Sequence, residues 1–223
     1  MTPGKAAGKR GDTREQVLEA ACIVFSEKGF RDATVADICE RAGANIAAVN
    51  YYFRDKETLY VEAWRLAFQR SLLAHPPDGG ISADASAEER LRAHVLSLML
   101  RIVDPESHEF EIVHKELANP SGLLAEVMRE SVDPLRRALS SIVRELLGAR
   151  ATDQHVQLCE MSLLAQCFHP MMRERHRKLL HKRAAGHPPC SVELTADHIV
   201  RFSLAGIQDM RRRIEAGELD GRR

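Results

Sequence analysis

Residues 45–53 carry side chains that suit hydrogen bonding and apolar contact with the edges of DNA bases. If Val49 and Phe53 point inward, steps of 100° along a helix place three residues outward: Ala47, Ala48 and Tyr51. Alanine is small enough to let a helix enter the major groove, where it can contact a thymine methyl group. Asn50, on the flank, can hydrogen-bond to an adenine edge. The segment therefore predicts sequence reading in the major groove.

A second group in the same region suits the DNA backbone rather than the bases. The hydroxyls of Tyr51 and Tyr52 and the ammonium of Lys56 can hydrogen-bond to phosphate oxygens. The N–H groups that begin a helix also attract phosphate, and one helix is expected to begin at Thr34. Together with Asn45, which precedes the next helix, these groups predict a compact contact with double-stranded DNA. An ordinary partner-binding surface is the alternative interpretation.

Two basic segments lie outside this region. Residues 1–14 hold four basic side chains and one acidic side chain. We expect residues 1–12 to form a flexible basic arm, either solvated or reaching the minor groove as homeodomain arms do. Residues 171–183 hold six Lys and Arg and one Glu. This segment fits a solvated helix end, which the helix dipole favours, or a second anionic partner.

Two motifs have the residue types of metal ligands. Glu111 and His114 form an ExxH element, which di-iron bundles use twice together with two further glutamates. The chain has no second ExxH. His187 and Cys190 are three residues apart, but zinc needs three or four converging ligands. We therefore expect no metal and no cofactor.

Composition narrows the class of protein. The 223 residues are 44% hydrophobic and 29% charged, which is typical of a soluble globular protein. The 32 Lys and Arg balance 32 Asp and Glu, which argues against DNA binding by bulk charge but permits a local footprint. Five cysteines without a CxxC pair indicate reduced thiols. The chain lacks an 18-residue apolar run and an apolar signal at its basic start, so we expect a cytoplasmic protein without a membrane span.

Capping residues followed by apolar residues at helical spacing predict an all-α fold. Four helices are expected first: Thr13 to Gly29, Thr34 to Gly43, Asn45 to Phe53, and Asp55 to about His75. A loop rich in Pro, Gly and Ser follows at 76–86. Further helices are expected beyond it: Ser86 to about Val103, 107–118, 122–147, 152–182 and 195–216. Pro134 should kink or split one of these helices, and Pro170 should bend another.

The aromatic residues indicate a domain boundary. Eight of the eleven lie between positions 25 and 68, so the N-terminal helices should enclose a small core of their own. Within 34–53, Gly43 permits the left-handed backbone of a tight turn, as a helix-turn-helix requires. We expect three parts: the arm 1–12, a helix-turn-helix DNA-binding domain at 13–75, and a helical domain for effector binding and dimerisation at 85–216.

The residues from Thr13 to Tyr60 resemble the DNA-binding domain of the tetracycline-repressor (TetR) family. The matches keep both residue type and spacing: Ala20, Ala21, Phe25, Gly29, Phe30, Thr34, Ile38, Ala42, Gly43, Phe53, Lys56 and Leu59. The resemblance implies that three residues occupy base-reading positions: Ile46, Ala47 and Ala48. Ile46 can alternatively tuck inward.

One position departs from the family pattern. The family usually has a phosphate-contacting tyrosine three residues before the phenylalanine, and this chain has Asn50 there. Tyr52 and Lys56 still fit phosphate contacts.

The C-terminal half resembles the CecR-type effector domain in residues 108–137, 163–168 and 202–207. Family membership implies a ligand pocket in this half and a dimer formed by the last two helices. Candidate pocket residues are adaptable Met and Phe side chains with one histidine as a polar contact: Met99, Phe110, His114, Met128 and Phe168. Candidate dimer residues are apolar: Val156, Met161, Leu164, Phe168, Ile199, Phe202 and Ile207.

The expected function is transcriptional regulation by a homodimer, with repression relieved when a small-molecule effector releases a palindromic operator. An enzyme on a helical bundle, for instance a metal oxidoreductase, is one alternative. The single ExxH and the lack of a phosphate loop or a recognisable nucleophile disfavour it. A helical adaptor is the other alternative. The identity of the effector, the operator and the sign of regulation stay open.

Overall fold

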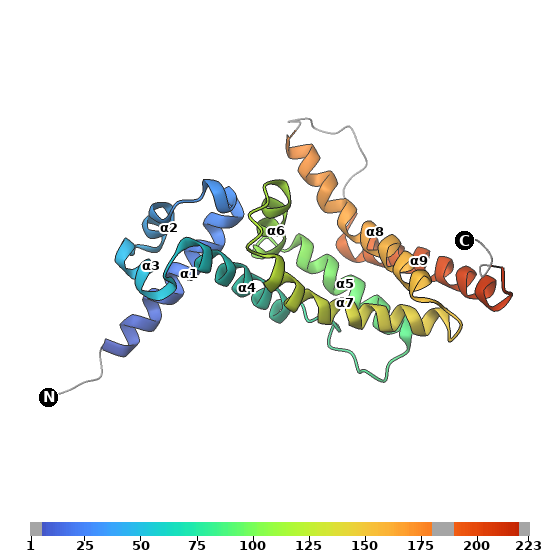
Figure 1. Cartoon of the computed structure of the whole chain (residues 1–223). Helices are drawn as coiled ribbons and strands as arrows, with labels where there is room; N and C mark the ends of the chain where they lie inside the picture. Colours follow the sequence, from blue (N-terminus) through green and yellow to red (C-terminus); the bar gives the residue numbers. More distant parts are fainter. Residues whose placement is uncertain (1–5, 180–189, 219–223) are drawn as a thin grey trace. The chain divides into compact units, whose positions relative to one another are not determined.

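Helices are the only regular secondary structure in the part of the chain that is described. The structure is a computed structural model that describes residues 6–179 and 190–218, with the backbone alone at 6–12 and 171–179. The helices are labelled in Figure 1: α1 (Ala6–Asp32), α2 (Val35–Ala42), α3 (Ile46–Phe53), α4 (Lys56–Ala74), α5 (Ala87–Val103), α6 (Glu109–Ala118), α7 (Ala125–Leu147), α8 (Asp153–Leu179) and α9 (Val192–Glu215). The predicted all-α fold is confirmed. After α1, the helix bounds agree with the prediction to within three residues, except that the predicted end of one helix at 182 lies outside the described residues.

The start of α1 differs from the prediction. The helix begins at Ala6 rather than at Thr13, and it runs through Gly8 and Gly11 although glycine is a weak helix former. Residues 6–12, which were expected in a flexible arm, are therefore helical, and residues 1–5 of that arm lie outside the described residues. At Gly29 the backbone has φ 78 and ψ 176, so the interruption of α1 lies where the sequence predicted it.

Side chains cap the helices of the helix-turn-helix at the predicted residues. The hydroxyl of Thr34 accepts the N–H of Asp37 at 3.1 Å, and the Asp37 carboxylate accepts the N–H of Thr34 at 2.9 Å. The side chain of Asn45 accepts the N–H of Ala48 at 2.9 Å and thereby caps α3. Between these helices Gly43 has φ 62 and ψ 28, the left-handed conformation that ends α2.

The prolines leave their helices continuous. Helix α7 runs through Pro134 and α8 runs through Pro170. Of the two outcomes expected at Pro134, a kink or a split, the split is therefore wrong. A proline removes one backbone donor. The residues of α7 beyond Pro134 remain anchored, because Leu139, Val143 and Leu147 are buried in the core.

The described chain divides into two compact units. The first contains the described residues up to Leu73 and Pro105–Ser131, and the second contains Ala74–Asp104 and the described residues from Val132 onward. Aromatic rings fill the core of the first unit. The Phe25 and Tyr60 rings meet edge to face with centroids 4.8 Å apart, and Trp64 stacks on Phe68 at 5.1 Å.

Helix α6 belongs to the first unit although it follows α5 in the sequence. It packs along α1, where the Ser26 hydroxyl lies 3.3 Å from Nδ1 of His108. The hydroxyl of Tyr60 on α4 donates to the Glu116 carboxylate on α6 at 3.1 Å. Glu116 also accepts the N–H of Ser121 at 2.8 Å, so one carboxylate joins α4 to the α6–α7 turn.

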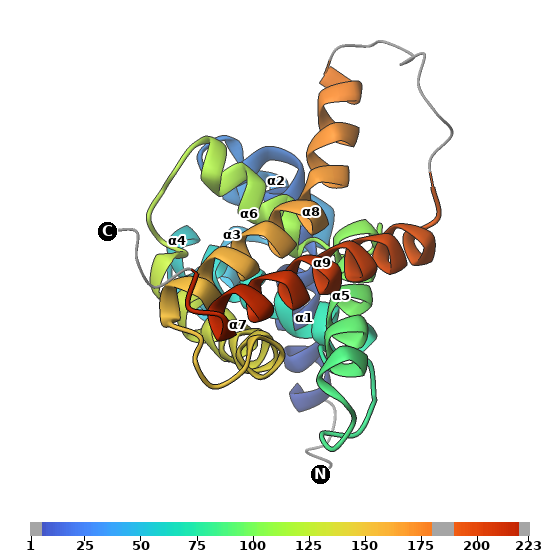
Figure 2. The same ribbon diagram turned by 90° about the vertical axis from the view of Figure 1, so that its right-hand side faces the viewer.

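The second unit has an aliphatic core. Helices α8 and α9 lie beside α5 (Figure 2). The buried side chains come from four helices: Leu91, Val95, Met99, Leu139, Val143, Leu147, Val156, Leu163, Cys167, Ile199, Val200 and Ile207. All five cysteines are free thiols, and burial raises the pKa of Cys22 and of Cys167 to about 12. None of the described helices is long and apolar enough to cross a membrane.

Gly29 and Gly43 allow a matched test of backbone conformation. The φ and ψ of Gly29 lie in a region that only glycine adopts readily, and an added Cβ would lie 3.3 Å from the Cβ of Lys115. Gly43 has a left-handed conformation that asparagine tolerates, with open space around it. Gly29→Asn should therefore lower the free energy of unfolding by about 1–3 kcal/mol, whereas Gly43→Asn should cost well under about 1 kcal/mol.

Thermal unfolding followed by circular dichroism measures both variants. For a chain of this size, about 1 kcal/mol corresponds to a change of roughly 2–4 °C in the melting midpoint. Equal midpoints for the two variants would show that the break in α1 does not need glycine.

Candidate nucleic-acid interface

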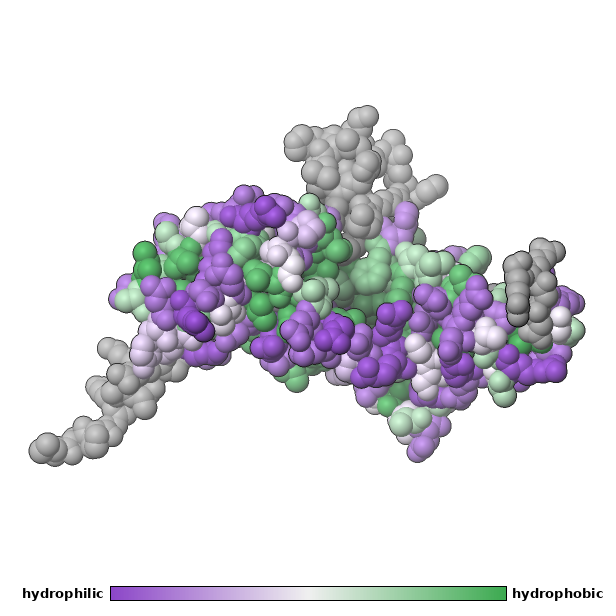
Figure 3. Space-filling view, viewed as in Figure 1, coloured by the Kyte–Doolittle hydropathy of each residue, from purple (hydrophilic) through white to green (hydrophobic). Residues whose placement is uncertain are grey.

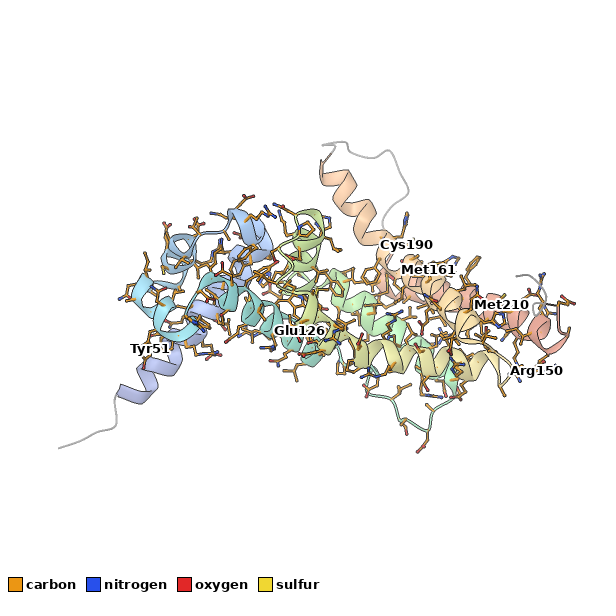
Figure 4. All side chains as sticks on the ribbon, in the orientation of Figure 1. Tyr51, Glu126, Arg150, Met161, Cys190 and Met210 are labelled. Atoms are coloured by element: carbon orange, nitrogen blue, oxygen red, sulfur yellow. The ribbon has the colours of Figure 1, made fainter. Side chains whose placement is uncertain are left out.

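Helix α3 buries the two residues that the sequence predicted to point inward. Val49 and Phe53 are buried, with 0% and 1% of their surface exposed, so they fix the inward direction. Ala47 and Asn50 are exposed and Ala48 is half-buried. Tyr51 is 71% exposed and lies at the surface of α3 (Figure 4). Small and polar side chains therefore share the exposed side of the helix.

Ile46 lies at the surface. Its side chain is 55% exposed at the first position of α3, so the alternative in which it tucks inward is wrong. The space beneath α3 is already filled, because Val49 and Phe53 are buried there. The hydropathy surface shows apolar groups over α3 on the side drawn in Figure 3. An exposed isoleucine at this position suits apolar contact with a base edge.

The two tyrosines of α3 support each other. The ring of Tyr51 meets that of Tyr52 edge to face with centroids 4.9 Å apart, and Tyr52 meets Phe53 at 6.4 Å. Tyr52 is half-buried. The aromatic contacts restrain Tyr51, so its exposed hydroxyl is presented from a packed ring.

The first turn of α2 is less open to phosphate than the sequence indicated. The N–H groups of Thr34 and Asp37 are both bonded within the capping box. Lys28 pairs with Asp37 at 2.8 Å. The hydrogen bond from Lys28, with those from Thr34, lowers the pKa of Asp37 to about 2, so this carboxylate is charged at neutral pH. A negative charge beside the helix N-terminus disfavours a second anion there.

Ion pairs position the helix-turn-helix on α1. Lys28 of α1 binds Asp37 of α2, and Arg41 of α2 binds Glu27 of α1 at 3.0 Å. The guanidinium of Arg14 lies 5.0 Å from the centroid of the Phe53 ring and also pairs with a carboxylate of α4. These contacts join α1 to both helices of the motif.

Lys56 at the start of α4 makes contacts within the protein. Its ammonium donates to the carbonyl of Phe30 at 2.9 Å and to that of Ala33 at 3.0 Å. The nitrogen also lies 4.3 Å from the centroid of the Phe30 ring. The sequence predicted a phosphate contact for Lys56 and gave no sign of these bonds, because Phe30 and Ala33 are distant in the chain.

The candidate effector residues belong to both units. Phe110, His114 and Met128 lie on α6 and α7 in the first unit, each partly exposed. Met99 and Phe168 lie in the second unit. Met99 is 1% exposed and forms part of the core of that unit, where it packs against its own protomer.

The candidate dimer residues divide by exposure. Three are buried within the protomer and cannot meet a partner directly: Val156, Ile199 and Ile207. Met161 is 60% exposed and Phe202 is 65% exposed, and Met161 is labelled on α8 in Figure 4. Leu158 and Leu194 are exposed as well, at 44% and 59%, and the sequence prediction missed them. Apolar surface is visible over α8 in Figure 3.

Metal ligands do not gather in the described ranges, 6–179 and 190–218. No group of three or more His, Cys, Asp or Glu there could hold a metal ion. Glu111 and His114 lie on α6, and His187 lies outside the described residues. The side chains of the basic segment 171–183 also lie outside them.

Two family profiles match successive parts of the chain. The profile of bacterial regulatory proteins of the tetR family matches residues 17–63, which include α2, α3 and the start of α4. The profile of the C-terminal domain of the HTH-type transcriptional dual regulator CecR matches residues 87–207, more than half of the chain.

Curated relatives carry the same description over most of their length. The HTH-type transcriptional regulator SrpR of Pseudomonas putida is 24% identical over 212 residues, which cover 81% of this chain and 94% of SrpR. The dual regulator CecR of Shigella flexneri is 28% identical over 172 residues, which cover 71% of this chain and 75% of CecR.

Solved structures show the same fold. A transcriptional regulator from Rhodococcus sp. Rha1 superposes with a TM-score of 0.64 at 22% identity, covering 86% of this chain and 96% of the other. The TetR-family regulator PfmR from Thermus thermophilus superposes with a TM-score of 0.61 at 21% identity, covering 85% and 97%. The family consists of DNA-binding regulators rather than enzymes. The chain therefore belongs to the TetR family of transcriptional regulators, with a C-terminal domain of the CecR type.

Proposed function

We propose that the protein is a homodimeric repressor that binds a palindromic operator and leaves it when a small-molecule effector binds the C-terminal domain. One observation carries the DNA-reading part of this proposal: the exposed side of α3 combines small residues with Asn50 and Tyr51 above a buried Val49 and Phe53. Such a face fits the major groove. We infer that the protein acts in the cytoplasm, where bacterial DNA lies.

The contacts of α3 divide into base-reading and backbone contacts. The proposed base-reading residues are Ile46, Ala47, Ala48 and Asn50. Asn45 at the start of α3 and Thr34 at the start of α2 are proposed to border them. Tyr51 and Tyr52 are proposed to contact phosphates through their hydroxyls. A twofold dimer would place two such helices in successive major grooves, so the operator should be palindromic.

The dimer is proposed to form through α8 and α9. Their outer surfaces carry exposed apolar side chains that a monomer would leave in water: Leu158, Met161, Leu194 and Phe202. A four-helix interface would bury them. Leu164 and Phe168, which are partly exposed on α8, are proposed to border this interface.

The effector is proposed to be a small amphipathic molecule. In the first unit the candidate contacts are Phe110 and Met128, with His114 as a polar contact. The second unit holds the other two candidates, Phe168 and the buried Met99. Helix α6 offers a route to the DNA-binding helices, because Glu116 accepts the hydroxyl of Tyr60 on α4. A ligand that moves α6 would therefore act on the core that supports α3.

Substitutions on α3 should separate base reading from backbone contact. Asn50→Ala and Ala47→Arg should change which duplex is preferred, because each good base contact contributes about 1–3 kcal/mol of discrimination. Tyr52→Phe should weaken binding to all duplexes alike, since it removes only a hydroxyl. Selection from a random duplex library, followed by binding titrations, measures both effects. Unchanged preference and affinity in all three variants would contradict the assignment of α3.

Charged residues placed on α8 and α9 should dissociate the dimer. Met161→Glu and Phe202→Glu put a carboxylate into the proposed interface, where loss of a hot-spot residue costs about 2 kcal/mol or more. Leu73→Glu is the matched control, because Leu73 is 81% exposed on α4 outside that surface. Sedimentation equilibrium should show dimers for the wild type and control and monomers for the two variants. A monomeric wild type at micromolar concentration would refute the proposed dimer.

Effector binding should weaken operator binding and should depend on the Tyr60–Glu116 hydrogen bond. A thermal-shift screen of antibiotics and other amphipathic compounds identifies ligands, and Trp64, the single tryptophan, reports binding by fluorescence. An allosteric coupling of about 1–3 kcal/mol would change operator affinity roughly 5- to 150-fold. Tyr60→Phe keeps the buried ring but loses the hydrogen bond to Glu116. This variant should still bind the ligand, and the ligand should lower its operator affinity less than it does in the wild type. Ligands that stabilise the protein and leave operator affinity unchanged would show that this pocket is not the switch.

A further inference from the structure

The joint between α3 and α4 holds two cationic residues with different environments. Arg54 ends α3, and Lys56 begins α4 after Asp55. Both lie beside the proposed DNA-reading face, so either is placed by sequence to meet a phosphate. Their surroundings distinguish them.

The ammonium of Lys56 is committed to the protein. Two of its three N–H groups are accounted for by the carbonyls of Phe30 and Ala33, at 2.9 and 3.0 Å. The Phe30 ring covers another side of the ammonium, with its centroid 4.3 Å from Nζ. The lysine is half-buried. Turning it towards a phosphate would break the contacts that join α4 to the end of α1.

The backbone at Arg54 is strained. Its φ is 69 and its ψ is −54, and the N–H of Asp55 donates to the carbonyl of Phe53 at 2.7 Å. These values define a classic γ-turn, which is rare because it forces a side chain into the left-handed region. Within the residues that the structure describes, Arg54 is the only residue other than glycine with a positive φ.

The side chain of Arg54 is exposed, and the structure describes no ion pair for it. The nearest acidic residue in the chain is Asp55, whose carboxylate accepts the N–H of Thr58 at 2.8 Å. Hydrogen bonds from Thr58 lower the pKa of Asp55, and the Arg54 charge lowers it further. Asp55 is therefore a charged helix cap, and the guanidinium next to it extends into solvent. Glycine would adopt this turn without strain, so an arginine here needs another reason.

We propose that Arg54 is the cation that contacts the DNA phosphate backbone at this joint, and that Lys56 is a positioning residue. The γ-turn presents the guanidinium directly after the recognition helix. Lys56 holds the end of α1 and the residue Ala33 after it, and α3 packs on α1 and α2. The inference depends on DNA binding through α3, and the experiment tests that binding separately.

The test uses the full-length protein and a duplex selected by the wild type from a random-sequence library. Binding is titrated over a range of salt concentration, because each lost phosphate contact lowers the slope of log affinity against log salt by about one. Arg54→Gln should lower the slope by about one per protomer and weaken binding to every duplex alike. Arg65→Gln is the matched control, since it removes one exposed arginine from α4 and should leave the slope unchanged.

Two further variants separate charge from backbone strain. Arg54→Gly should lower the salt slope as Arg54→Gln does and should also raise the melting midpoint, because glycine relieves the γ-turn. Lys56→Met keeps the aliphatic chain over Phe30 and should lower the melting midpoint while leaving the salt slope unchanged.

The outcomes distinguish the two assignments. A normal slope in Arg54→Gln, with a reduced slope in Lys56→Met, would overturn the proposal and assign the phosphate contact to Lys56. A normal slope in both would overturn the proposal and leave DNA binding intact. A wild type that enriches no duplex would refute DNA binding itself and the assignment with it.

Discussion

The Lys56 ammonium, at the start of α4, binds the end of α1 and the residue that follows it. The ammonium of a typical surface lysine is solvated, whereas that of Lys56 donates to two backbone carbonyls that follow the break in α1. Hydrogen bonds from a charged donor are stronger than neutral ones, so this contact fixes the turn between α1 and α2 against the start of α4. The break itself requires Gly29, whose backbone lies outside the range of other residues. The direction of α3 depends on both the Lys56 contact and the break at Gly29.

The charge distribution explains how a neutral protein can bind DNA. Near the helix-turn-helix, Lys28 and Arg41 are paired with carboxylates and serve to hold α2 on α1. These two cations are therefore committed to contacts within the protein. We propose that specific affinity comes from placed contacts, including Arg54 and the tyrosine hydroxyls of α3, together with close approach of the small residues. This arrangement favours specific over bulk electrostatic binding.

The sequence alone determined the local features. The caps at Thr34, Asn45 and Asp55 lie where the sequence places them, because a capping hydrogen bond joins residues three apart in the chain. The same reasoning failed at Thr13, where α1 begins at Ala6 although Gly8 and Gly11 disfavour helix. The inward direction of α3 was also predictable, since Val49 and Phe53 lie one helical turn apart. The family followed from a joint pattern of such local features.

The tertiary structure decided which side chains are exposed and which are buried within the protomer. Residues of equal hydrophobicity on α8 and α9 differ in exposure, because one face of each helix packs in the protomer core: Ile199 is buried and Phe202 is exposed. The packing of α6 with α1 and α4 depends on contacts such as Tyr60–Glu116, between residues far apart in the chain. The sequence singled out Lys56 as a phosphate contact, whereas in the structure Lys56 donates to two backbone carbonyls and Arg54 is exposed. These hydrogen-bond partners come from distant segments of the chain, so a local sequence pattern does not reveal them.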